Sequence, residues 1–202
     1  MSTEPNIGPG SLALFGGTFD PIHNGHLFLA RRAYELCQLD QVLFLPCFQS
    51  PHKEGVQSAP GPHRLAMIEA AIEGHPEFAV SGHELQQKGP SYSWQTAEYF
   101  HTKWPETELF WLLGIDQWKV IERWARSDYL ATLVSFIVFP RDGIKPEDRE
   151  GYRSIRLPDE RFDLSATDIR EALTRGESIA GKTAPAVETY LREHRLYGDR
   201  DH

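Results

Sequence analysis

The feature that most constrains the fold is a junction near the start of the chain. The apolar run "SLALF" (residues 11–15) leads directly into Gly16 and Gly17, and a segment of helical periodicity begins near Asn24. A short, continuous apolar run bounded by turn residues is typical of a strand buried on both faces. Asn24 is a favourable residue for capping a helix. The junction therefore predicts a central strand followed by a helix that starts at Asn24.

The same alternation of strand and helix continues to the end of the chain. Further extended segments are expected at 41–46, 78–82, 108–114, 132–140 and 154–157. Helical periodicity is present at 25–39, 63–73, 93–104, 116–122, 167–176 and 185–197. Strands that alternate with helices predict a parallel sheet covered on both sides. We therefore expect an α/β fold with a Rossmann-like parallel sheet and helices on both faces.

Length and patterning predict the domain organisation. A chain of 202 residues fits one hydrophobic core. We expect residues 1–10 to be a flexible leader and residues 11–202 to form a single domain that includes the C-terminal helices. No run approaches the roughly 20 apolar residues of a membrane span, and the first ten residues lack the features of a signal peptide. A cytoplasmic protein without membrane attachment is expected, with Cys37 and Cys47 as buried thiols.

The charge of the chain bears on its ligands. Asp and Glu outnumber Lys and Arg by 29 to 21, which gives a formal net charge of −8. Proteins that hold nucleic acid by neutralising its phosphates need a surplus of basic residues on one face. The composition therefore argues against a nucleic-acid partner. Any polyanionic ligand has to be bound by a local group of donors.

Such donors gather in the stretch "FGGTFDPIHNGH" (15–26). Ligands of open parallel sheets bind beyond the carboxyl ends of the strands, where Gly16 and Gly17 are expected. Glycine allows main-chain N–H groups to approach a ligand closely, and a helix N-terminus favours an anion. His23 and His26 would face the same space and donate to phosphate oxygens. A zinc site would need further ligands that the sequence does not supply, and a plain glycine-rich turn is the other alternative.

This stretch resembles the signature of nucleotidyltransferases with the (H/T)xGH motif. Its form GGTFDPxHxGH is similar to that of bacterial nicotinate-nucleotide adenylyltransferases of NAD biosynthesis. The resemblance extends from about residue 12 to 197. Four further segments occur in the order of that family: "SPHK" (50–53), "GPSYSWQT" (89–96), "GIDQWKVIERW" (114–124) and "LSATDIR" (164–170).

The resemblance implies a reaction and a set of site residues. The enzyme would transfer the adenylyl group of ATP to nicotinate mononucleotide, giving deamido-NAD and pyrophosphate, with Mg²⁺ carried by ATP and no metal ligands on the protein. The implied catalytic residues are His23, His26, Lys53 and Arg170. The implied ATP-binding residues are Gly16, Gly17, Thr18, Phe19, His23, His26, Gly114, Asp116, Ser165, Thr167 and Arg170. The implied mononucleotide-binding residues are Lys53, Tyr92, Ser93 and Trp124.

The residues themselves support part of this assignment. Ser165, Thr167 and Arg170 surround a helix start, so that hydroxyls, main-chain donors and a guanidinium could meet one anion. The alternative is ordinary helix capping by Ser165. Lys53 follows the second strand in a loop, where an ammonium could reach a phosphate or simply face water.

Several assignments stay open. Asp116 could meet a ribose at the sheet edge or serve as a helix N-terminal carboxylate. Trp124 resembles the tryptophan that stacks on the pyridine ring in the family, although a core role is the alternative. Ser93 stands where the family usually has Thr, and Ala125 where some relatives have Tyr. The roles of His52, Arg64 and Arg141 are undecided.

Two rival functions follow from the same residues. The first keeps the reaction but uses another acceptor, with nicotinamide mononucleotide favoured over pantetheine phosphate and flavin mononucleotide. The second is a nucleotide-sensing module that binds ATP or NAD without chemistry. A dehydrogenase is disfavoured, because no G-x-G-x-x-G follows the first strand. The oligomeric state is not predicted.

Overall fold

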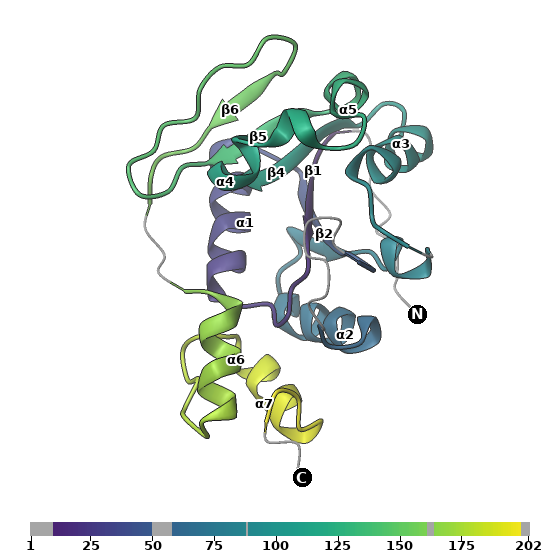
Figure 1. Cartoon of the computed structure of the whole chain (residues 1–202). Helices are drawn as coiled ribbons and strands as arrows, with labels where there is room; N and C mark the ends of the chain where they lie inside the picture. Colours follow the sequence, from purple (N-terminus) through teal and green to yellow (C-terminus); the bar gives the residue numbers. More distant parts are fainter. Residues whose placement is uncertain (1–9, 50–57, 88, 161–163, 199–202) are drawn as a thin grey trace.

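One parallel sheet organises the molecule. The structure is a computed structural model, which describes residues 10–49, 58–87, 89–160 and 164–198. Within these residues the strand order is β3-β2-β1-β4-β5-β6, and every neighbouring pair is parallel (Figure 1). The strands are β1 (Ser11–Gly17), β2 (Gln41–Pro46), β3 (Phe78–Val80), β4 (Glu108–Gly114), β5 (Ser135–Phe139) and β6 (Ser154–Arg156). The predicted Rossmann-like sheet is confirmed.

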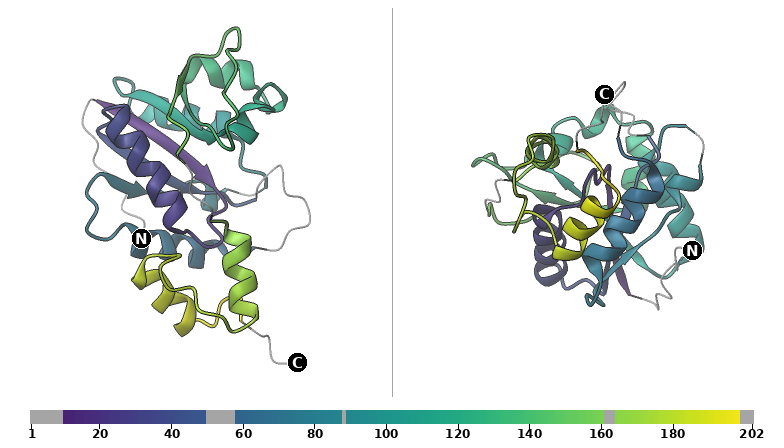
Figure 2. Two further views of the ribbon diagram at one scale, coloured as in Figure 1. Left: turned by 90° about the vertical axis from the view of Figure 1, so that its left-hand side faces the viewer. Right: turned by 90° about the horizontal axis from the view of Figure 1, so that it is seen from below.

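Helices cover both faces of this sheet. The helices are α1 (Asn24–Leu36), α2 (Gly61–Ile72), α3 (Ser93–Lys103), α4 (Ile115–Trp118), α5 (Ser127–Leu133), α6 (Ala166–Thr174) and α7 (Pro185–Glu193). Buried residues of α1, α2, α6 and α7 join one core cluster, and those of α3, α4 and α5 join the other. Both views show α6 and α7 together at one end of the molecule, next to α2 (Figures 1 and 2). Within the described ranges, no helix combines the length and apolar character needed to cross a bilayer.

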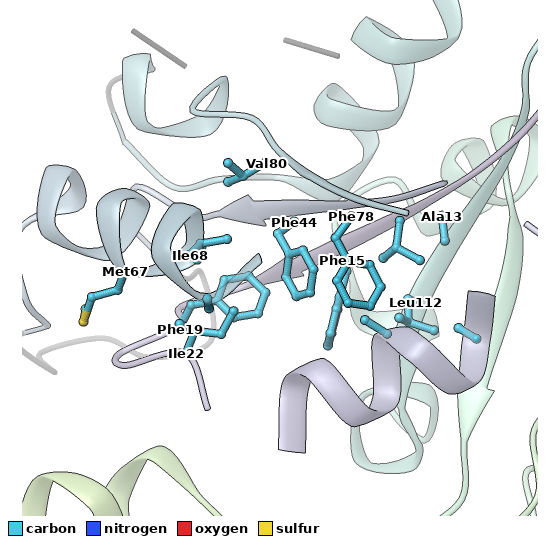
Figure 3. Close-up of a cluster of buried hydrophobic side chains, with 14 of the residues drawn as sticks. Ala13, Phe15, Phe19, Ile22, Phe44, Met67, Ile68, Phe78, Val80 and Leu112 are labelled. Carbon is cyan, nitrogen blue, oxygen red and sulfur yellow. The ribbon is translucent and has the colours of Figure 1, made fainter. Parts of the chain in front are cut away.

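The central strand owes its unbroken apolar sequence to burial on both sides. In β1, Ala13 and Phe15 belong to the first core cluster, whereas Leu12 and Leu14 belong to the second. Successive side chains of a strand point to opposite faces, so a strand between two helix layers needs apolar residues at every position. Phe15, Phe19 and Phe44 lie side by side between the sheet and helices α1 and α2 (Figure 3).

Some boundaries differ from the expectation. The strands expected at 41–46 and 108–114 have those bounds in the structure, whereas the run 132–140, predicted as one strand, contains the end of α5 before β5 begins at Ser135. Leu133, at the end of α5, is followed by Val134 and the buried residues of β5, and this apolar run concealed the end of the helix. The helix expected at 116–122 is the short α4 followed by a 3₁₀ turn at Ile121–Arg123. Its last predicted turn is therefore wrong.

The two helices at the end of the chain also stop earlier than predicted. Helix α6 ends at Thr174, and Gly176 follows in the left-handed region with φ +69°, a conformation that suits glycine after a helix. Helix α7 ends at Glu193 rather than at residue 197. Both Arg195 and Tyr197 have positive φ, so the chain turns away from the helix axis there.

The two cysteines are free thiols. Cys47 is buried, as predicted, and burial raises the pKa of its thiol. Cys37 is only half-buried: it is the C-cap residue of α1 and packs against the edge of the first core cluster. The prediction of a buried thiol is therefore wrong for Cys37.

Candidate active site

A cavity lies where the strand order reverses. From β1 the sheet grows in one direction through β2 and β3, and in the other through β4, β5 and β6. Ligands of such sheets bind beyond the carboxyl ends of the strands at this point. A cavity of about 310 Å³ opens there, and its wall includes the ends of β1 and β4. The predicted site residues that line it are Gly16, Gly17, Thr18, Ser93, Gly114 and Trp124.

The two glycines at the end of β1 lie against aromatic rings. A Cβ atom on Gly17 would stand 2.9 Å from the ring of Phe19, and one on Gly16 would stand 3.0 Å from the ring of Trp111. Both distances are shorter than an ordinary carbon–carbon contact. Only glycine therefore fits here without moving a ring. The sequence explained the two glycines by the close approach of a ligand. The structure adds a second reason, which is the close approach of the protein's own aromatic side chains.

Phe19 belongs to the core, although it was predicted to bind ATP. Its side chain is 2% exposed, and its ring contacts the rings of Phe15, Phe44 and His26. The main chain of Phe19 has φ +50°, in the left-handed region. Any contact of Phe19 with a ligand is therefore left to its main chain.

The two histidines lie directly upon one another. The ring centroids of His23 and His26 are 3.7 Å apart and the rings are nearly parallel. The main-chain N–H of His23 donates to Nδ1 of His26 over 3.2 Å. A ring nitrogen that accepts a hydrogen bond carries no proton, so the neutral His26 ring has its proton on Nε2. This hydrogen bond fixes His26 as an Nε2–H donor.

Burial controls the charge of His23. The side chain is buried, and burial lowers the pKa of His23 to about 4, while the Asp168 carboxylate acts in the opposite direction. At neutral pH the ring is therefore uncharged in this structure. His23 offers a neutral hydrogen-bond donor, and the positive charge of the site has to come from other side chains.

The residue that caps α1 is His23, not Asn24 as predicted. Asn24 is the first residue of the helix, and its Nδ2 donates to the main-chain oxygen of Gly181 over 2.8 Å. Its main-chain N–H donates to the oxygen of Lys182 over 3.0 Å. The side chain of Asn24, which was predicted to cap the helix, thus bonds instead to a residue 157 positions further along the sequence. These bonds attach the C-terminal part of the chain to the histidine motif.

Helix α6 begins with the cap that the sequence left as an alternative. Ser165 is the N-cap residue, and its Oγ accepts from the N–H of Asp168 over 3.1 Å. Ser165 Oγ also donates to the carboxylate of Asp168 over 2.7 Å, and this bond lowers the pKa of Asp168. Thr167 is exposed in the first turn, and its Oγ1 accepts from Nη2 of Arg170 over 3.2 Å.

Arg170 connects α6 to the loop after β1. Its Nη1 donates to the main-chain oxygen of Asp20 over 2.7 Å and lies 3.9 Å from the carboxylate oxygen Oδ2 of Asp20. Asp20 is three residues before His23, and Asp168 of α6 is close enough to His23 to influence its pKa. The structure therefore brings together the two motifs that the sequence placed at opposite ends of the chain.

Arg64 is buried, which the sequence had left undecided. It is 2% exposed at the start of α2. Its guanidinium donates to the main-chain oxygens of Thr18 (2.8 Å), Cys47 (2.7 Å) and Ala59 (2.9 Å). One side chain thus joins the loop after β1, the loop after β2 and the residues before α2. Arg64 therefore fixes the shape of the cavity floor.

A buried carboxyl group forms another part of the wall. Glu84 is 4% exposed and accepts a hydrogen bond from Thr96 Oγ1 over 2.7 Å. Burial raises the pKa of Glu84, and hydrogen bonds from Thr96 and Ser91 oppose this effect. Ser91 Oγ also accepts from the N–H of Phe48 over 3.0 Å. No sequence motif identified Glu84, because it sits in the polar segment "HELQQ" and its burial depends on the fold.

The remaining predicted residues occupy different positions. Trp124 lines the cavity and also packs edge-on against Trp111 at 6.4 Å, so both of its sequence-based roles remain compatible with the structure. Tyr92 is half-buried at the N-cap of α3, next to Ser93 on the wall. Asp116 is exposed in the first turn of α4 and is not part of the wall.

Three further residues complete the comparison with the sequence. Arg141 is exposed and forms an ion pair with the adjacent Asp142 at 3.7 Å. Lys53 and His52 fall outside the described residues. Within the residues that the structure describes, no three His, Cys, Asp or Glu side chains gather as metal ligands would.

Comparisons with known proteins agree with the fold and the motifs. The cytidylyltransferase-like family model matches residues 14–172. A relative from Methylacidiphilum infernorum is 40% identical over 187 residues, which cover 92% of this chain and 91% of the relative. A relative from Bacillus pumilus is 37% identical over 186 residues, covering 92% and 97%. Both carry the name "Probable nicotinate-nucleotide adenylyltransferase".

A solved structure shows the same architecture. The Plasmodium falciparum nicotinic acid mononucleotide adenylyltransferase complexed with NaAD superposes with a TM-score of 0.72 at 19% identity, covering 93% of this chain and 97% of that one. Likeness at this identity supports the fold. The family assignment rests on the family model and on the two bacterial relatives. By its sequence along nearly its whole length, the chain belongs to the cytidylyltransferase-like family, together with the nicotinate-nucleotide adenylyltransferases.

Proposed function

We propose that this protein transfers the adenylyl group of ATP to nicotinate mononucleotide, forming deamido-NAD and releasing pyrophosphate. The observation that carries the proposal is the meeting of two distant motifs, where Arg170 of α6 bonds to Asp20 beside the stacked His23 and His26. The names of the bacterial relatives support the choice of reaction.

The reaction needs positioning more than it needs a protein nucleophile. An oxygen of the mononucleotide's 5′-phosphate attacks the α-phosphorus of ATP and forms a new P–O bond. The bond from the α-phosphorus to the bridging oxygen breaks in line, and pyrophosphate leaves with the electron pair. Such transfers depend on alignment and on stabilising charge on the phosphate oxygens. Mg²⁺ arrives with ATP as part of that substrate.

Each end of the site has a part in this scheme. His26 donates through Nε2–H, His23 through its neutral ring, and Arg170 supplies a permanent positive charge for the phosphates of ATP. Lys53 is proposed to add a second positive charge from the loop after β2. The glycines at the end of β1 give the phosphates access to the main chain.

The cavity is proposed to take the pyridine half of the mononucleotide. Trp124 offers an aromatic face on its wall, which suits a flat heterocycle. Ser93 offers a hydroxyl, and Tyr92 precedes it at the start of α3. Gly114, at the end of β4, and Asp116, in the first turn of α4, are proposed to meet the adenosine half of ATP.

Turnover of the two mononucleotides tests the proposal directly. The protein is expected to release pyrophosphate from ATP with nicotinate mononucleotide, at a higher kcat/KM than with nicotinamide mononucleotide. A coupled assay for pyrophosphate measures both reactions. A preference for the amide would change the acceptor, and binding of ATP without any pyrophosphate would favour the sensing module.

Removing the His26 ring is expected to slow the chemical step. The variant His26→Ala loses the Nε2–H donor, and loss of one oxyanion contact typically costs about a hundredfold or more in kcat. Steady-state kinetics with ATP and nicotinate mononucleotide provide the measurement. His101→Ala is the matched control, because His101 is exposed in the last turn of α3. Thermal unfolding curves establish that both variants are folded. Equal activity of the two folded variants would remove His26 from the mechanism.

Burial of His23 is expected to make stability depend on pH. The pKa of His23 is about 4 in the folded protein and about 6.5 in an unfolded chain. Between pH 6.5 and pH 4, His23 is protonated in the unfolded chain but remains mostly unprotonated in the folded protein. The free energy of unfolding should therefore fall by about 3 kcal/mol over this range from His23 alone.

The variant His23→Gln isolates this contribution. Urea denaturation of wild type and variant at several pH values gives the difference between their unfolding free energies. That difference should shift against the wild type by about 3 kcal/mol between pH 7 and pH 4. Parallel pH profiles would show that His23 titrates normally in the folded protein.

A further inference from the structure

Asp20 is the centre of a buried hydrogen-bond network. Its side chain is nearly inaccessible, at 5% exposed. The carboxylate oxygen Oδ1 accepts two hydrogen bonds, from the hydroxyl of Tyr197 (2.5 Å) and from the N–H of Ala59 (2.9 Å). Its main-chain oxygen accepts from Nη1 of Arg170. Asp20 thus joins the phosphate-binding arginine to the last residues of the described chain.

Tyr197 reaches Asp20 from 177 residues further along the sequence. Helix α7 ends at Glu193, and the chain then turns back through Arg195 (φ +48°) and Tyr197 (φ +63°). Left-handed backbone costs a non-glycine residue about 1 kcal/mol, so this turn has to be held by contacts that it makes possible. The ring packs against the core cluster of α2, α6 and α7. Burial and the bond to Asp20 raise the pKa of the Tyr197 phenol, which stays a donor.

A second link joins Tyr197 to the same arginine. Thr174 lies one turn after Arg170 on α6. Its hydroxyl lies within hydrogen-bond distance of the main-chain oxygens of Arg170 (3.0 Å) and Tyr197 (3.2 Å). The segment after α7 is therefore attached to α6 through its main chain and to Asp20 through its side chain. Both attachments lead to Arg170.

The other side of Asp20 is fixed by a rigid frame. Ala59 donates to Asp20 through its N–H, and its oxygen accepts from the buried guanidinium of Arg64. Arg64 also holds the oxygen of Thr18, two residues before Asp20. Tyr197, which comes from the segment after α7 rather than from this frame, donates the other hydrogen bond to Oδ1.

The geometry explains what the phenol does for Arg170. The second carboxylate oxygen of Asp20, Oδ2, lies 3.9 Å from Nη1 of Arg170, which is longer than a hydrogen bond. Without Tyr197, the carboxylate could rotate about its own bonds and form a direct charge-assisted pair with the guanidinium. That pair would compete with the phosphates of ATP for the same donors.

We propose that Tyr197 is a positioning residue for ATP, whose hydroxyl holds the Asp20 carboxylate away from Arg170 so that the guanidinium stays available to the triphosphate. This inference rests on the proposed function, because it assumes that Arg170 binds ATP. It adds the C-terminal segment to the site as a structural requirement for nucleotide affinity.

The variant Tyr197→Phe removes only the hydroxyl. Calorimetry with α,β-methylene-ATP and Mg²⁺ should show about tenfold weaker binding, or about 1.4 kcal/mol. Kinetics should show a similar rise in KM for ATP, with KM for nicotinate mononucleotide within about twofold of wild type. Tyr190→Phe is the matched control, because the hydroxyl of Tyr190 forms a half-buried hydrogen bond with His63, between α2 and α7, instead of one with Asp20. Its nucleotide affinity should equal that of wild type.

A double variant separates positioning from general loosening of the fold. Adding Asp20→Asn to Tyr197→Phe removes the charge that would compete for Arg170, so affinity for the analogue should recover toward wild type. A merely structural role for Tyr197 predicts the opposite, since two disturbed contacts would weaken binding further. Wild-type affinity in Tyr197→Phe, equal losses for both substrates, or a further loss in the double variant would each overturn the proposal.

Two measures keep the test readable. If Tyr197→Phe does not fold, Thr174→Val loosens the same segment at an exposed position and should weaken analogue binding about threefold; unchanged affinity would contradict the proposal. Turnover of wild type with nicotinate mononucleotide reports on the proposed function, whereas analogue affinity reports on Tyr197. Failure of the proposed function and failure of the role proposed for Tyr197 can therefore be told apart.

Discussion

The arrangement of the site depends on one contact, the hydrogen bond from Arg170 to the main-chain oxygen of Asp20. It joins the start of α6 to the loop after β1, two segments that are 150 residues apart in the sequence. Without it, the histidine motif would present only two uncharged rings, because burial lowers the pKa of His23 and Nδ1 of His26 accepts a hydrogen bond. The contact places a permanent positive charge beside two neutral donors. This combination suits a phosphate chain and explains how a chain of net charge −8 can attract one.

The fold prepares this contact at several levels. The glycines at the end of β1 fit against Phe19 and Trp111. The carboxyl end of β1 lies at the point where the strand order reverses. Arg64 then holds the loops that follow β1 and β2 through their main-chain oxygens. Asn24 attaches the segment between α6 and α7 to the start of α1. The proposed site for two anionic substrates is thus lined by main-chain groups that a few side chains hold in place.

The sequence predicted the sheet and most of its helices, because apolar periodicity and glycine-rich turns are local signals. That the two motifs meet was implied by the resemblance to the nucleotidyltransferase family and not by periodicity. It did not predict Arg64, Glu84 or Tyr197. Each of these has an ordinary polar neighbourhood in the sequence, and each acquires its role through burial against segments far along the chain. Helix α5 was missed for a related reason, since its apolar residues merge with those of β5. The capping role given to Asn24 was wrong because a tertiary contact took its side chain.

The most direct measurement of the central claim is a crystal structure of the protein with α,β-methylene-ATP and Mg²⁺. The account predicts that one triphosphate contacts Nε2 of His26 and the guanidinium of Arg170 together, with the analogue beyond the ends of β1 and β4. A nucleotide bound elsewhere, or a triphosphate that touches the histidines while Arg170 stays engaged only with Asp20 and Thr167, would contradict it.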